Sequence, residues 1–420
     1  MKKKIQRVAG SMKEFEDQMT SRKTVVPYKF IPSLMILASA LCAMSTTILT
    51  PALPFIAHYF DSSNDAAQKI LSLNLLGVGL SGLIYGAISE SLGRRFLFLT
   101  GITLFSVSAF LSFFAESFNI LWGLQIIQGC GIGCAAVLPL AVIRDVYSGK
   151  RAAYLMSLFG ILMALSPALS PLVGGVITEY LGWEFIFLIL GGVGIVLGAG
   201  LFFGLPETHP QELRHPVSFL LLFKNYGRLL KNTKFLRFAV LPWFSFSGLW
   251  VYSSTAPFVF IENLGLTPME YGKYPIITIL GVVIGNIFVN RLIKVLELLT
   301  FLKIGSMSLL LGISGLLVAT GYDCKDPLFY ASIMFFYCFG FGSLWSASLS
   351  LAMDHVSYGK GYGAALIRSG QLLSGSLGVM VSGLLYQGSF LFPGLFILAC
   401  SMAITVLVWT TSKSEIYISD

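Results

Sequence analysis

The sequence predicts an all-α integral membrane protein with twelve transmembrane helices arranged as two lobes of six. Three observations predict this fold. Of the 420 residues, 55% are hydrophobic and only 11% are charged, whereas soluble proteins carry about 25% charged residues. Twelve apolar runs are each long enough to cross the hydrocarbon core of a bilayer, which takes about 20 residues. One long polar connection separates the first six runs from the last six.

The apolar runs are expected to be helices, because backbone polar groups in lipid must find their partners within the protein. Runs this long and continuous exclude barrel strands, which alternate apolar and polar residues. The first six runs form an N-lobe over 30–204, and the last six form a C-lobe over 238–411. In chain order, the predicted spans are 30–52, 70–88, 96–115, 119–143, 153–179, 183–204, 238–260, 274–292, 301–320, 328–353, 361–386 and 390–411.

The segments between the spans predict the orientation. The tail over 1–29 carries eight Lys and Arg residues without the apolar stretch of a signal peptide. The central loop over 205–237 carries six more, whereas the opposite side holds only Lys69, Lys273 and Lys325. The positive-inside rule therefore places both tails, the second over 412–420, in the cytoplasm of a bacterium, with the protein crossing the inner membrane many times. The net charge of +8 reflects this bias, so no nucleic-acid partner is expected.

The second part of the central loop has one apolar face and several basic residues. This pattern is typical of a helix that lies on the inner leaflet and contacts membrane lipid, although a solvated linker would have the same composition. The basic residues are Lys224, Arg228, Lys231, Lys234 and Arg237.

The cysteine and glycine motifs of the sequence do not indicate an enzyme. Cys130 and Cys134 lie four residues apart in one apolar run, and packing explains them better than a metal site. The glycines of Gly129–Cys134 lie within a span and not in a strand-to-helix turn, so they do not predict a phosphate site. We therefore expect no enzyme activity, no metal and no cofactor. A non-transporting receptor or scaffold stays open as a rival to a transporter.

The loop after the second span carries a glycine-bounded motif with charges, GAISESLGRR, which can clip neighbouring helices together at the cytoplasmic side. It resembles the loop motif of the major facilitator superfamily, with Glu in place of the usual Asp. The resemblance implies a gate latch, whose partner at the end of the fourth span would be Asp145 beside Arg144. The motif residues are Gly86, Glu90, Gly93, Arg94 and Arg95.

The fifth span contains SPALSPLVGG, whose prolines kink a helix and whose glycines let neighbours approach. Pro167, Pro171, Gly174 and Gly175 are similar to the helix-five signature of antiporters, with Ser170 in place of its first glycine. The whole chain resembles the bicyclomycin-resistance and chloramphenicol-efflux (Bcr/CflA-like) branch of the drug-efflux transporters. Further segments that carry this resemblance are Thr50–Phe60, Gly182–Phe187, Leu205–Thr208 and Glu262–Lys273.

The resemblance implies a monomeric carrier that exports drug-like molecules by alternating access and confers multidrug resistance. Two positions depart from the branch. Thr47 occupies the place of an acid in helix one that binds protons, and Gln125 replaces an arginine in helix four. No Asp or Glu lies in the middle third of any predicted span. The coupling ion, whether a proton, another ion or none, is therefore left open.

A single charge, Arg368, lies roughly 10 Å into the eleventh span. Charges at depth cost about 2.5–3.5 kcal/mol and usually face a water-filled cavity, and a guanidinium suits carboxylate or phosphate. One hypothesis is that Arg368 contacts an anionic group of the substrate; the other is that it snorkels or pairs with Glu90 or Asp354. The candidate substrate-binding residues are Arg368, Gln125, Asn74, Thr47, Gln371 and Trp250.

For each of these amides an interhelical hydrogen bond is the alternative, and for Trp250 it is packing. Two substrate classes follow. The branch implies a broad set of drugs or small metabolites, whereas Arg368 and the missing acid favour a specific anionic metabolite, such as a carboxylate siderophore.

Overall fold

The computed structural model describes residues 30–209, 211–214, 218–356 and 360–412. Regular structure in these ranges is helical, and twelve helices are long and apolar enough to cross a membrane. The predicted fold class is confirmed. The N-lobe contains α2 (Ile31–Thr47), η2 (Thr50–Ala52), α3 (Leu53–Tyr59), α4 (Asn64–Leu92), α5 (Arg94–Ser112), α6 (Phe118–Val146), α7 (Gly149–Tyr180) and α8 (Glu184–Gly204).

The connection between the lobes contains η3 (Gln211–Leu213) and α9 (Phe219–Lys231), the latter in the part of the loop with the amphipathic pattern. The C-lobe contains α10 (Thr233–Pro257), η4 (Phe258–Asn263), α11 (Pro268–Tyr271), α12 (Tyr274–Leu292), α13 (Leu298–Gly321), α14 (Pro327–Asp354), α15 (Lys360–Leu385) and α16 (Leu391–Trp409).

The first span continues to Tyr59, seven residues beyond the predicted end, and the helix type changes near that end. Pro51 and Pro54 lack the N–H that an α-helix interior needs. The chain therefore passes from α2 through the 3₁₀ turn η2 into α3, and the span continues to Tyr59. Other helices begin earlier than predicted because a polar residue caps their first turn. Ser63 accepts a hydrogen bond from the Ala66 amide and starts α4 six residues before the predicted span.

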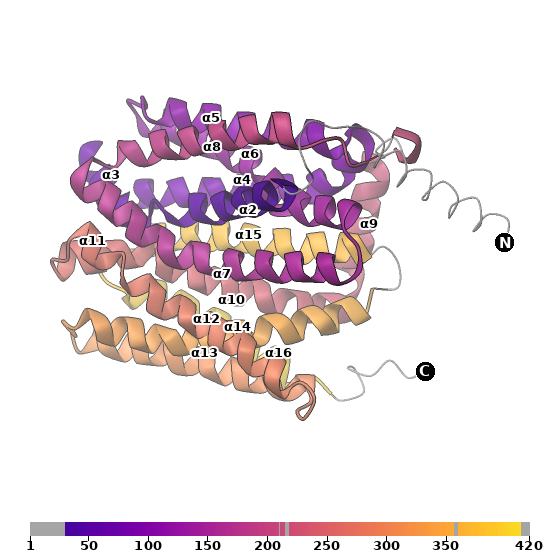
Figure 1. Cartoon of the computed structure of the whole chain (residues 1–420). Coiled ribbons are helices and arrows are strands. Elements are labelled where there is room, and N and C mark those ends of the chain that lie inside the picture. The colour runs from indigo at the N-terminus through magenta and orange to yellow at the C-terminus, as the bar shows by residue number, and fades with distance from the viewer. Residues whose placement is uncertain (1–29, 210, 215–217, 357–359, 413–420) are drawn as a thin grey trace.

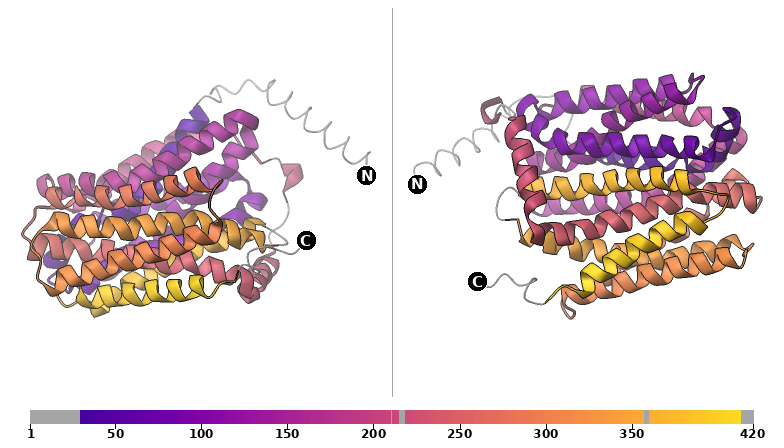
Figure 2. Two further views of the ribbon diagram at one scale, coloured as in Figure 1. Left: turned by 90° about the horizontal axis from the view of Figure 1, so that it is seen from below. Right: turned by 180° about the vertical axis from the view of Figure 1, so that it is seen from behind.

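The helices run roughly side by side, with the N-lobe packed on the C-lobe (Figure 1). We call the inner end the one where α2 begins, α16 ends and α9 lies, and the outer end the one that holds α3 and α11. Seen from below, the N-lobe helices slope away from the C-lobe helices toward the inner end (Figure 2, left).

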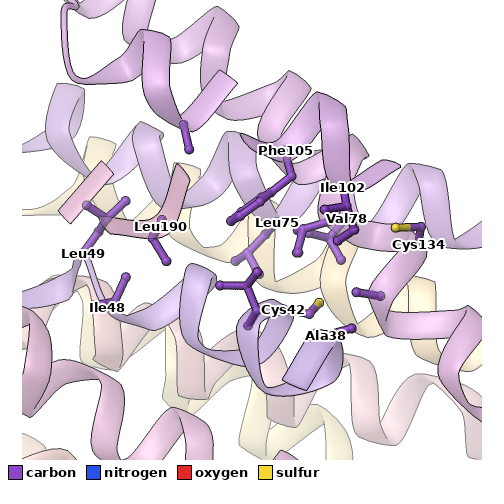
Figure 3. Packing of buried hydrophobic residues seen from close by; sticks show 14 of the residues in the cluster. Ala38, Cys42, Ile48, Leu49, Leu75, Val78, Ile102, Phe105, Cys134 and Leu190 are labelled. Atoms are coloured by element: carbon purple, nitrogen blue, oxygen red, sulfur yellow. The ribbon is translucent and has the colours of Figure 1, made fainter. Parts of the chain in front are cut away.

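One apolar core is centred in each lobe, and C-lobe side chains such as Phe246 pack against both cores. In the N-lobe, Cys42 of α2 and Cys134 of α6 lie among buried apolar side chains such as Leu75 and Phe105 (Figure 3). Close helix contacts rely on glycine: a Cβ added at Gly129 of α6 would collide with the backbone carbonyl of Asn74 in α4. Cys134 therefore packs in the core, as expected, and within the described residues no cluster of His, Cys, Asp or Glu could hold a metal.

Candidate functional site

Arg368 lies on the side of α15 that faces away from lipid. Leu377, nine residues further on and about two and a half turns away, is 62% exposed on the opposite side of the helix. Neighbours of Arg368 pack against the other lobe: a Cβ added at Gly82 of α4 would stand 3.0 Å from the hydroxyl of Ser369. Arg368 itself retains exposed surface although protein surrounds it. This placement puts Arg368 on the side of α15 that faces the N-lobe, with part of its surface exposed.

The partners of Arg368 come from its own helix and from the opposite lobe. Its guanidinium donates a hydrogen bond of 3.4 Å to the Oε1 atom of Gln371, which is fully buried. It also lies within electrostatic range of the Cys42 thiol on α2. Among the described residues, no ion pair joins Arg368 to Glu90 or Asp354. The charge therefore points between the lobes, and its long bond to Gln371 leaves most of its donors available.

Asn74, Gln125 and Gln128 form a chain of buried amides between α4 and α6. The Asn74 Nδ2 atom donates to Gln125 Oε1 at 3.3 Å, and the Gln125 Nε2 atom donates to Gln128 Oε1 at 2.6 Å. All three residues are at most 1% exposed. The interhelical hydrogen bond, the alternative considered for these amides, accounts for Asn74 and Gln125. Two atoms of the chain, Asn74 Oδ1 and Gln128 Nε2, have no partner among the described residues.

Thr47 and Trp250 also lie at helix contacts. The Thr47 hydroxyl makes a short hydrogen bond with the Ser170 hydroxyl of α7, so the two residues that depart from the branch patterns of helices one and five contact each other. Trp250 of α10 is 6% exposed and packs against Gly375 of α15. These two positions are occupied by protein partners in this state.

The latch motif at the inner end is half formed. The Arg94 Nε atom lies 3.3 Å from Asp145 Oδ2, as the resemblance implies, and Arg94 also donates to the Ser89 hydroxyl. Gly93 links α4 to α5 with a φ of 98°, a conformation that favours glycine. Glu90 and Arg144 are exposed and form no ion pair among the described residues. The Arg94–Asp145 pair joins helices of the N-lobe only, and around Gly86 there is open space.

Glu207 caps the start of α5 at the inner end of the N-lobe. In the sequence it stood out only as part of the segment Leu205–Thr208 that carries the resemblance. Its carboxylate accepts hydrogen bonds from the backbone amides of Arg94 at 2.9 Å and Arg95 at 3.3 Å, at the start of α5. It also lies 3.3 Å from the Arg214 guanidinium. An acid at a helix N-terminus satisfies free N–H groups and complements the helix dipole. No local pattern could reveal this role, because the amides lie more than 100 positions away in the sequence.

At the outer end, the helix-five glycines sit where backbones touch. A Cβ added at Gly175 would collide with the carbonyl of Pro268 in α11, and one added at Gly174 would collide with the carbonyl of Ile48. Pro171, in the same motif, lies against Gly272, whose added Cβ would stand 2.6 Å from its carbonyl. Pro167 lies within α7 as well. The contact of Gly175 with Pro268 and that of Pro171 with Gly272 join the N-lobe to the C-lobe.

We call the outer seam the set of polar contacts that joins the lobes from the outer end toward the middle. Asn64 donates to Glu262 at 3.3 Å, and the Met269 amide donates to Glu179 at 3.1 Å. Ser254 donates to Gln68 at 3.3 Å, deeper along α4. Ser72 and Ser376 bond each other further in, at 3.0 Å between hydroxyls. Sequence reasoning missed the seam, because each contact pairs residues from opposite halves of the chain.

The twelve spanning helices of the described ranges, arranged in two lobes that pack against each other, define the fold of a two-lobed membrane transporter. The chain belongs to the Major Facilitator Superfamily, whose family model matches residues 35–367. Its fold and family are those of transporters and not of enzymes, and it is a multi-pass membrane protein.

The relatives confirm the resemblance to the drug-resistance branch. The chain is 27% identical to the bicyclomycin resistance protein homolog of Haemophilus influenzae, over 66% of this chain and 69% of that one. It is 24% identical to the chloramphenicol resistance protein CraA of Acinetobacter baumannii, over 85% of each. It is 27% identical to multidrug resistance protein D of Escherichia coli, over 84% of this chain and 88% of that one.

Solved structures agree on the fold. A D-xylose-proton symporter superposes with a TM-score of 0.74 at 15% identity, covering 93% of this chain and 99% of that one. A bacterial homolog of the lysosomal transporter Spinster superposes with a TM-score of 0.73 at 16% identity, covering 94% and 99%.

Proposed function

We propose that the chain exports small, drug-like molecules across the bacterial inner membrane by alternating access. The names of its relatives, which refer to bicyclomycin, chloramphenicol and multidrug resistance, support this direction and substrate class. The inner end is the cytoplasmic one in this proposal, as the basic residues of α9 and of the loops at that end favour.

The structure corresponds to the inward-facing state in this proposal, and the outer seam is the observation that carries it. Polar contacts and close backbone approaches join the lobes at the outer end, whereas the latch at the inner end makes its ion pair within one lobe. Arg368, between these ends, has exposed surface. A substrate would therefore enter from the cytoplasm and leave after the seam opens.

An efflux assay tests this function. The chain is expressed in a bacterial strain that lacks its own drug exporters, and the accumulation of labelled chloramphenicol and of a panel of other antibiotics is measured. We expect lower accumulation of at least one drug than with the empty vector, and accumulation at the vector level for Gly175→Leu, in which the outer seam cannot close. Unchanged accumulation for the whole panel would contradict drug export, and binding without counterflow in proteoliposomes would favour a receptor.

The position of Arg368 favours a second, narrower substrate class, that of anionic molecules. An arginine that points between the lobes with free donors suits a carboxylate or phosphate. Hydrogen bonds to charged groups contribute about 1.5–3 kcal/mol. We therefore expect Arg368→Gln to raise the KM of an anionic substrate by roughly tenfold or more, while a neutral substrate of similar size is little affected.

Proteoliposome uptake with matched anionic and neutral substrates measures this difference. Arg368→Lys, which keeps the charge but loses the planar fork, should give an intermediate KM for the anion. Lys150→Gln, at an exposed lysine of the inner end, serves as the control. An equal loss of both substrates in Arg368→Gln would mean that the residue acts on the fold or the gate and not on an anion.

A further inference from the structure

Helix α9 runs across the direction of the spans at the inner end of the molecule (Figure 2, right). The Tyr226 hydroxyl of α9 donates to the carbonyl of Leu83, which lies inside the apolar run predicted as the second span, over 70–88. The spanning helix α10 begins at Thr233, directly after α9. These connections place α9 beside the spans, at the level where they enter the bilayer.

The side of α9 that packs on the protein uses only part of its apolar residues. Leu222, Tyr226 and Leu229 are at most 8% exposed and belong to the C-lobe core. Their spacing of four and three residues puts them on one face of the helix. A second set of apolar side chains points away from the protein, with exposed fractions from 46% to 82%. This set consists of Phe219, Leu220, Phe223 and Leu230.

The third face of α9 is basic. Lys224, Arg228 and Lys231 are exposed, and among the described residues none of them has an ion-pair partner. The helix itself contains no Asp or Glu. Because successive residues are turned by about 100°, the centres of the three faces lie roughly 110–140° apart. The helix therefore has one side for protein, one that suits acyl chains and one that suits anionic headgroups.

We propose that α9 docks on the inner leaflet of the membrane, with its exposed apolar face among the acyl chains and its basic face on anionic phospholipid headgroups. A solvated linker fits less well, because water would leave four neighbouring large apolar side chains uncovered. Basic residues on a membrane-surface helix attract the anionic lipids of the cytoplasmic leaflet. The docking is independent of the transported substrate.

Fluorescence quenching in nanodiscs tests which face of α9 meets the lipid. A bimane label is attached to Phe223→Cys or to Leu221→Cys, in the full chain with Cys324→Ser. Leu221 is the matched control, because it is apolar and 50% exposed but lies beyond the basic face, away from Phe223. Lipids with a nitroxide on the acyl chain should quench the label at position 223 several times more strongly than the label at position 221. Iodide in the water should quench them in the reverse order.

The charges are tested by comparing nitroxide-labelled phosphatidylglycerol with nitroxide-labelled phosphatidylcholine as quenchers of the label at position 223. Each basic residue near an anionic surface contributes about fivefold, so phosphatidylglycerol should be preferred about fivefold beside α9. Combining Lys224→Gln, Arg228→Gln and Lys231→Gln should make the two lipids nearly equal quenchers. The matched control combines Gln substitutions at three exposed cations of the inner end outside α9, and it should keep the wild-type preference. These cations are Lys150, Arg291 and Lys294.

The other outcomes would overturn the docking. Equal quenching of the two labels by acyl-chain nitroxides would show that the face with Phe223 does not meet lipid. Weak quenching of the label at position 223 by both nitroxide and iodide would show that protein, such as a second copy of the chain, covers this face. An unchanged preference in the α9 triple variant, or an equal loss in the control triple variant, would show that the basic face does not bind anionic headgroups.

Discussion

At the scale of single residues, the candidate site depends on the position of one charged side chain, that of Arg368. Arg368 could be singled out from sequence, because one charge in an apolar run is conspicuous, and the structure places it on the interlobe side of α15. The alternative in which it pairs with Glu90 or Asp354 has no ion pair among the described residues to support it. The sequence alone did not show which face of the helix carries Arg368. The packing shows it, because the neighbouring Ser369 contacts α4 and Leu377, on the opposite side of the helix, is exposed.

The carboxylate of Glu207 gives a prediction at the same scale. Glu207→Gln keeps the shape of the side chain but loses the charge that two amides of α5 and Arg214 share. A lost cap of this kind costs about 1 kcal/mol, so we expect a lower Tm in detergent, followed by intrinsic fluorescence. The exposed neighbour Glu212 provides the control, and a Tm change in Glu212→Gln as large as in Glu207→Gln would remove the special role of Glu207.

At the scale of elements, the number and order of the spans followed from hydropathy, whereas their ends did not. Hydropathy reports the part of a helix that suits lipid. The ends depend on caps such as Ser63 and on helix breaks such as Pro51, which lie in polar or mixed flanks. The sequence also could not predict what the amphipathic segment packs against. In the structure, α9 packs on the C-lobe through Leu222 and Tyr226.

Helix α7 supplies a matched pair of glycines for a test of the outer seam. Gly175 touches the backbone of α11, whereas a Cβ at Gly160 meets nothing within 4 Å. Both substitutions by alanine raise helix propensity equally, by about 1 kcal/mol. Drug efflux is therefore expected to fall in Gly175→Ala, because its backbone neighbour cannot move aside easily, and to stay unchanged in Gly160→Ala. Equal efflux in the two variants would show that close approach at the seam is unimportant.

Helix α9 connects the lobes at the inner end, where a hydroxyl of α9 bonds to α4 and apolar side chains of α4 pack nearby. Burial, with the nearby Tyr362 adding to it, raises the pKa of Tyr226 to about 12, so its hydroxyl stays protonated and donates to the carbonyl of Leu83 in α4 at 2.8 Å. Tyr226→Phe removes about 1 kcal/mol of this state's stability. A cysteine placed at Asn64 in the outer seam should then react several times faster with a water-soluble maleimide.

Tyr154→Phe, at an exposed tyrosine of α7, is the control for that labelling rate. If Tyr226→Phe left the rate at the wild-type value, the hydrogen bond to Leu83 would have no part in holding the inward-facing state.

At the scale of the whole molecule, two lobes of six helices could be read from the apolar runs and the long central loop. The state of the transporter could not, because it depends on contacts such as Asn64 with Glu262 and Ser72 with Ser376, which join distant parts of the chain. The packing of the whole molecule also shows what surrounds Thr47 and Gln125, the two positions that depart from the branch pattern. Each has a neutral hydrogen-bond partner in place, Ser170 for Thr47 and Asn74 or Gln128 for Gln125.

A reversible cross-link across the outer seam tests alternating access most directly. Asn64→Cys and Glu262→Cys are combined in a Cys324→Ser background, which removes the native thiol of the outer loop, and joined by a short cleavable reagent. Since the two side chains lie within 3.3 Å in this state, we predict that cross-linking proceeds readily, stops transport, and is reversed on cleavage with full recovery of transport. Transport at the uncross-linked rate while the bridge is intact would contradict the account.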